Sequence, residues 1–131
     1  MKIDQAELIE FFGVLPTSQE PSEQEFFGTT IFDVELDNHH LSFSCSTIYN
    51  DVFIFLRDIT PQQELLEIRL TEVEEIKIRR DQPMSVPVMC IKTGNSLTAD
   101  SHSYPTQTVE LSLSPKIMIK VSNYKTSISI P

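Results

Sequence analysis

The chain has 131 residues, of which 40% are hydrophobic and 22% charged, and its formal net charge is −9 at pH 7. This length suits one domain with its own core, and no run of about 18 apolar residues could form a transmembrane helix. An acidic protein repels phosphates, so the charge argues against a nucleic-acid partner and is compatible with a basic protein partner, although the acidic residues could also serve only to keep the chain soluble. We expect no membrane partner.

The negative charge is concentrated in the first part of the chain. Residues 1–37 hold nine acids and one base, whereas the remaining 94 residues hold ten acids and nine bases. The N-terminus also lacks the basic-then-apolar order of a signal peptide, so we expect a cytoplasmic protein. Cys45 and Cys90 both stand at apolar positions of predicted strands, which predicts two buried free thiols.

We predict a single domain over residues 1–131. It comprises an N-terminal helix and its stop over 1–16, an acidic loop over 17–25, and an antiparallel β domain over 26–131. Asp4 can cap the amides of the helix, and Gly13 can take the left-handed conformation that ends it.

Apolar and polar residues alternate from Ile31 onward in one short run after another. A period of two is typical of half-buried strands, because successive side chains leave opposite faces of a sheet. The sequence therefore predicts an all-β, mainly antiparallel fold with one short N-terminal helix. A two-layer β-sandwich is the favoured architecture and a flattened or partly open barrel is the alternative, since three glycines are few for a closed barrel.

The best-determined local unit is a hairpin that turns at Asp37-Asn38. A two-residue loop there pairs Val34 with Leu41 and Phe32 with Phe43, so that the apolar residues of both strands share one face.

The next strand, 52–56, is apolar throughout, which predicts cover on both of its faces. We expect the N-terminal helix to cover Phe53 and Phe55, and a turn at Asn50-Asp51 to place Arg57 opposite Ser44. Residues 62–80 alternate in two charged-faced strands, although their composition also suits a single helix.

Four residues near this hairpin are the candidate partner-binding site. Asp33, Glu35 and Asp37 alternate with apolar neighbours, so we expect all three on one outward face at a spacing of roughly 7 Å. The hairpin register places His40 opposite Glu35. Uncompensated carboxylates on a rigid strand suit a basic partner surface.

Apart from these acidic residues, the sequence contains no residue pattern typical of a catalytic, metal or cofactor site. His39 and His40 point to opposite faces of a strand, no zinc-type spacing occurs, and there is no nucleophile motif or Gly-rich phosphate loop. We therefore expect no enzyme activity, no metal and no cofactor.

The leading hypothesis is a non-enzymatic protein-binding module that presents its acidic strand face to a basic protein, as a monomer or a homodimer. This small, acidic, all-β profile is similar to that of bacterial immunity proteins that neutralise toxins. The alternative is a small-molecule-binding β domain whose cavity lies between sheets and is roofed by the 93–108 loop.

Overall fold

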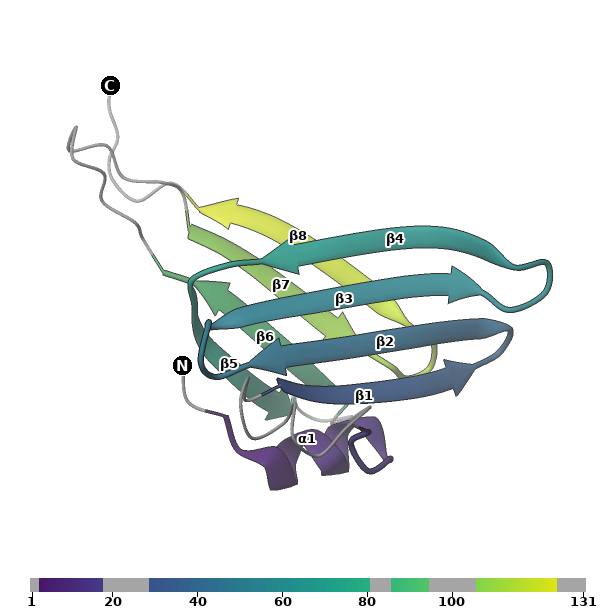
Figure 1. The fold of residues 1–131 in the computed structure, drawn as a ribbon, viewed down its shortest axis with the longest axis horizontal. Helices are drawn as coiled ribbons and strands as arrows, with labels where there is room; N and C mark the ends of the chain where they lie inside the picture. The colour runs from purple at the N-terminus through teal and green to yellow at the C-terminus, as the bar shows by residue number, and fades with distance from the viewer. Residues whose placement is uncertain (1–2, 18–28, 81–85, 95–105, 125–131) are drawn as a thin grey trace. The chain divides into compact units, whose positions relative to one another are not determined.

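The computed structural model describes residues 3–17, 29–80, 86–94 and 106–124. The chain divides into two compact units, Met1–Thr71 and Glu72–Pro131, each built on a four-stranded antiparallel sheet (Figure 1). The elements are α1 (Gln5–Phe12), β1 (Thr29–Leu36), β2 (His39–Ser46), β3 (Asp51–Asp58), β4 (Gln63–Leu70), β5 (Val73–Arg80), β6 (Pro87–Thr93), β7 (Thr106–Ser112) and β8 (Met118–Tyr124).

The predicted fold class is confirmed. The described strands are antiparallel, they form two separate sheets with the orders β1-β2-β3-β4 and β5-β6-β7-β8, and they close no barrel. Two such sheets are consistent with a sandwich. The single domain stays a prediction.

The helix α1 begins and ends where its sequence predicts. The Asp4 carboxylate accepts hydrogen bonds from the amides of Ala6 and Glu7 at 3.0 and 3.3 Å. Gly13 closes the helix with a φ of 72°, which a glycine adopts without the clash that a Cβ causes. Of the acidic loop 17–25, only Thr17 belongs to the described residues.

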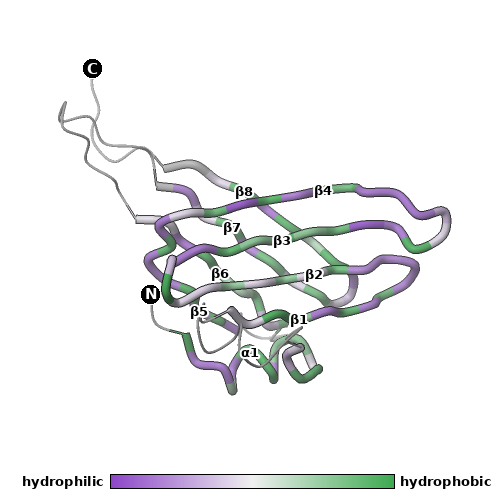
Figure 2. The backbone as a smooth tube through the Cα atoms, viewed as in Figure 1, coloured by the Kyte–Doolittle hydropathy of each residue, from purple (hydrophilic) through white to green (hydrophobic). Residues whose placement is uncertain are grey.

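The β1–β2 hairpin has the predicted register. Asp37 and Asn38 have φ values of 52° and 40°, so both residues of the turn are left-handed, as a tight two-residue hairpin requires. Val34 pairs with Leu41 and Phe32 with Phe43. All four of these side chains are buried, and Figure 2 shows hydrophobic and hydrophilic residues interspersed along the strands.

The core of the first unit is aromatic, and it corrects the predicted position of the helix. The Phe12 ring stacks on Phe32 at 4.8 Å between centroids and lies 5.1 Å from Phe43. The helix thus covers the inner face of the sheet. Phe53 and Phe55 pair with Ser44 and Ser42 of β2, and these four side chains lie on the other face of the sheet. The prediction that α1 covers Phe53 and Phe55 is therefore wrong. The reason is that Phe12 finds its apolar partners on Phe32 and Phe43, and a helix this short buries one face only.

Residues 62–80 form the two predicted strands, β4 and β5, rather than the alternative helix. The break between them is at Thr71-Glu72, where Glu72 has a φ of 55°. Alternation therefore outweighs the helix-forming composition, because each strand can place its apolar side chains on one face.

The second unit has its own alternating pattern. Met89, Ile91, Val109 and Leu111 are fully buried. Cys90, between two of them, points the other way and is half-buried, so the prediction of a buried thiol is wrong there and confirmed for Cys45. The Arg79 Nη1 atom donates to Cys90 Sγ at 3.0 Å. The predicted loop 93–108 and the last short strand, near Ile128, lie mostly or wholly outside the described residues.

Replacing Phe12 tests the aromatic core. We expect Phe12→Ala to lower the free energy of unfolding by about 3–5 kcal/mol, because a large buried ring leaves a cavity between Phe32 and Phe43. Leu15→Ala is the control, since Leu15 is 73% exposed and its truncation should cost no more than about 0.5 kcal/mol. Urea denaturation measures both values. Equal effects would contradict the docking of α1.

Burial of Cys45 makes stability depend on pH. Desolvation raises the pKa of the Cys45 thiol from 9.0 to about 12. Because the folded pKa lies above the unfolded one, this contribution is complete below pH 9 and is lost as the pH rises from about 9 to about 12.

We therefore expect the free energy of unfolding to fall more steeply above pH 9 in the native protein than in Cys45→Ala. At pH 8 iodoacetamide should modify Cys45 in urea but not in the folded protein, as peptide mass mapping would show. Rapid labelling of the folded protein at Cys45 would refute the burial.

Candidate protein-binding face

The candidate site is the outer face of the first sheet, the face opposite Phe12. Strand pairing aligns its residues in rows that cross all four strands. Because the side-chain period is two, each row is separated from the next by one inward-pointing row. The rows are Ile31, Ser44, Phe53 and Arg69; then Asp33, Ser42, Phe55 and Glu67; then Glu35, His40, Arg57 and Glu64.

The predicted site residues lie in or beside this face. Asp33 and Glu35 point outward from β1 and are exposed, and Glu35 pairs with His40 as expected. Asp37 lies in the turn beyond β1, exposed at the tip of the hairpin. Among the described residues, neither Glu35 nor Asp37 has a hydrogen-bond or ion-pair partner. Their charge is therefore open to solvent.

His40 joins three elements through a chain of hydrogen bonds. Its Nε2 lies 3.1 Å from Asp33 Oδ1, and its Nδ1 accepts from Arg57 Nε at 3.0 Å. The Thr17 hydroxyl completes the chain by donating to Asp33 Oδ2 at 3.2 Å. Asp33 is thus held in place, while its neighbour Glu35 is not.

The contact with Arg57 corrects the expected β2–β3 register. Arg57 pairs with His40 rather than with Ser44. The chain reverses over the four residues 47–50, with Ser46 facing Asp51, instead of in a two-residue turn at Asn50-Asp51. This shift is by an even number of residues, so every side chain keeps its predicted face.

The hydrogen bonds define the protonation of His40. Arg57 is always a donor, so Nδ1 must carry a lone pair, and the proton of the neutral ring is on Nε2, facing Asp33. Both ring nitrogens are therefore engaged. This arrangement leaves His40 no free lone pair with which to act as a general base.

The centre of the face is aromatic, which the sequence did not reveal because a covering helix was expected there. Phe53 and Phe55 stack with their centroids 6.4 Å apart and their planes at 12°. Arg69 lies over Phe53 with its guanidinium carbon 5.2 Å from the ring centroid, and it donates to Glu67 at 3.2 Å. Both rings are half-buried, between the small serines of β2 and the charged side chains of β4.

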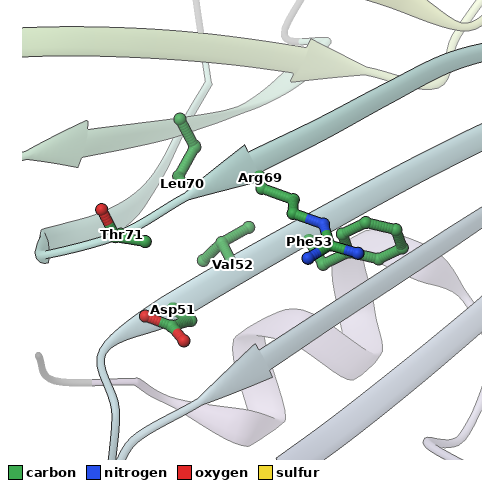
Figure 3. A pocket seen from close by; sticks show the side chains of 6 residues that line it. All are labelled: Asp51, Val52, Phe53, Arg69, Leu70 and Thr71. Carbon is green, nitrogen blue, oxygen red and sulfur yellow. The ribbon is translucent and has the colours of Figure 1, made fainter.

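A pocket of about 340 Å³ lies where β3 begins and β4 ends, lined by 51–53 and 69–71 (Figure 3). All of these lining residues belong to the first unit. The alternative hypothesis predicts a small-molecule cavity covered by the 93–108 loop. This cover is not tested, because residues 95–105 of the loop lie outside the described residues.

His39 points away from this face. Its Nδ1 lies 2.8 Å from Asp58 Oδ1, whereas His40 faces Asp33. In the described ranges, no group of three His, Cys, Asp or Glu residues is placed to hold a metal ion. No helix in those ranges is long and apolar enough to cross a membrane.

Sequence comparison with family models finds no match, and none of the curated proteins matches the chain. The solved structures do provide a similar fold. It is that of a chain in a contact-dependent growth inhibition toxin–immunity protein complex from Klebsiella pneumoniae 342. The TM-score is 0.71, and the match covers 92% of this chain and 94% of that chain at 20% identity. At this identity the similarity establishes the fold.

The network around His40 can be tested by NMR. We expect ¹⁵N spectra of the folded protein at pH 7.5 to show a protonated Nε2 and an unprotonated Nδ1, because the Arg57 donor at 3.0 Å excludes a proton on Nδ1. Arg57→Gln is the comparison, since an amide can also accept a hydrogen bond and should allow the other tautomer. A proton on Nδ1 in the native protein would contradict the arrangement.

Proposed function

We propose that this protein is a non-enzymatic protein-binding module of the immunity-protein type, which presents the outer face of its first sheet to a basic protein. The charge of the first unit carries this proposal. Met1–Thr71 contains thirteen acids and three bases, a net charge of −10, whereas Glu72–Pro131 contains six acids and seven bases, a net charge of +1. A field of one sign on one unit attracts a partner of the opposite sign.

The composition of the face supports a protein partner. Phe53 and Phe55 supply apolar area at its centre, and Glu35 and Asp37 supply charge at its edge. Protein interfaces have this arrangement, an aromatic centre within a polar rim. The serines Ser42 and Ser44 are small enough for a partner to approach the sheet closely.

The similarity in fold supports a place in a toxin–immunity pair. The neighbouring structure is a complex of both kinds of protein. The immunity role is favoured for this chain because its acidic first unit suits a basic partner. The same proposal places it in the cytoplasm, where its two free thiols stay reduced.

A charge-variant experiment tests the proposed function. The purified protein would capture partners from cells of its source at low salt, and each captured protein would be produced separately. We expect a basic partner whose affinity falls about tenfold or more between low and high salt, as steered association does. In the variant Glu35→Lys/Asp37→Asn the affinity should fall by a similar factor, because neither carboxylate is paired with a described residue.

The matched control is Glu75→Lys/Glu74→Gln, which makes the same change in net charge on two exposed residues of the second unit. It should bind as the native protein does. Co-expression provides the second measurement, because a partner that stops growth alone should not do so together with this protein. A partner whose binding ignores salt and the first variant, or whose toxicity is not relieved, would refute the proposal.

A further inference from the structure

The strand β8 is an edge of the second sheet, and two of its apolar side chains are exposed. In the order β5-β6-β7-β8 it pairs with β7, and no other described strand pairs with its outer side (Figure 1). Met118 and Val121 are 54% and 53% exposed, and they leave opposite faces because three positions separate them. Such an edge presents backbone amides and carbonyls beside apolar side chains, to which a further strand can pair.

The apolar row of the second sheet runs out to this edge. Val109 and Leu111 of β7 are 0% exposed, and they pair with Val121 and Ile119 of β8. Val121 is nevertheless 53% exposed. Among the described residues the row therefore ends at β8, and a strand added beyond β8 would continue it with further side-chain pairs.

We propose that this edge binds β8 of a second copy of the chain, paired antiparallel about a two-fold axis at Ile119. The second sheets of the two copies then continue as one sheet of eight strands. In this register Ile119 faces Ile119 of the second copy, and Val121 faces Ile117, the residue before β8. Each copy extends the apolar row of the other through the same surface, as a two-fold dimer requires.

The side chains of β8 select this register. Directly opposed residues share a face, so the two-fold axis must pass through a residue. An axis at Lys120 would place two lysines opposite each other, and like charges in that position destabilise a strand pair. An axis at Val121 would place the apolar Ile119 opposite Asn123. With the axis at Ile119, Lys120 lies opposite Met118, and no lysine faces a lysine.

The distribution of charge also favours association through the second unit. Met1–Thr71 has a net charge of −10 and repels its own copy, whereas Glu72–Pro131 has a net charge of +1. Within the sheet Lys120 lies opposite Glu110 of β7, an opposite charge that favours its place in a strand pair. The exposed residues of β5, the other edge, are all charged, which protects that edge from pairing.

The oligomeric state of the full chain tests the pairing. We expect sedimentation velocity to show a monomer–dimer equilibrium with a Kd of about 1–100 μM, because one strand pair makes a small interface. Val121→Lys should raise the Kd about tenfold or more, since it places an ammonium opposite Ile117. The control is Leu65→Lys, the same kind of change at a 45% exposed position of β4, and it should leave the Kd unchanged. Circular dichroism should show that both variants are folded.

Introduced cysteines locate the axis. Directly opposed Cα atoms of two antiparallel strands lie about 4.5 or 5.5 Å apart, which is within the range of about 4.4–6.8 Å for a disulfide. Ile119→Cys should therefore give a disulfide-linked dimer on oxidation. Val121→Cys should not, because its two copies lie four positions apart along the strands, about 14 Å. Both are made together with Cys90→Ser, and Cys45 is buried.

Three results would overturn the inference. They are a chain that stays monomeric well above about 100 μM, equal effects of Val121→Lys and Leu65→Lys, and a disulfide with Val121→Cys rather than with Ile119→Cys. The pairing does not depend on the proposed function, because Glu35 and Asp37 belong to the first unit and β8 to the second.

Discussion

The register of the β1–β2 hairpin is the constraint on which the first unit depends. Asp37 and Asn38 both adopt left-handed conformations, and the tight turn that results aligns Phe32 with Phe43 on one face. That face provides the surface against which Phe12 stacks. The opposite face receives Asp33, Glu35 and His40 by the same alternation. A shift of one residue in either strand would place its charged side chains in the core and its apolar ones in solvent.

The outer face combines fixed and free charges. A neutral imidazole lies between the Arg57 cation and the Asp33 carboxylate, and the Thr17 hydroxyl satisfies the second oxygen of Asp33. These contacts hold three elements together without adding net charge of their own to the surface. The carboxylates of Glu35 and Asp51, which no described residue pairs with, lie on other parts of the sheet. A rigid support with free charges and an aromatic centre meets two needs of tight recognition, preorganisation and complementarity.

Local signals in the sequence predicted local structure well. The cap at Asp4, the stop at Gly13 and the hairpin at 37–38 are confirmed, because each depends on residues a few positions apart. Two predictions that needed distant information were wrong. The helix covers Phe32 and Phe43 rather than Phe53, and Arg57 faces His40 because the β2–β3 turn has four residues. Cys90 has an apolar neighbour on each side, and only the phase of β6 shows that it points outward.

The sequence by itself determined the alternating pattern of the strands, the face of the side chains in the β1–β2 hairpin and the concentration of acids in the first part of the chain. These properties follow from a period of two and from composition, which no packing can alter. Only the tertiary structure decided which charges are neutralised and which are free, since that depends on pairing between strands. It also revealed the aromatic centre and the pocket at the end of β3 and β4. The acidic residues that the sequence places on one strand therefore form one edge of a larger face. On this edge Asp33 is hydrogen-bonded to His40, whereas Glu35 is exposed to solvent.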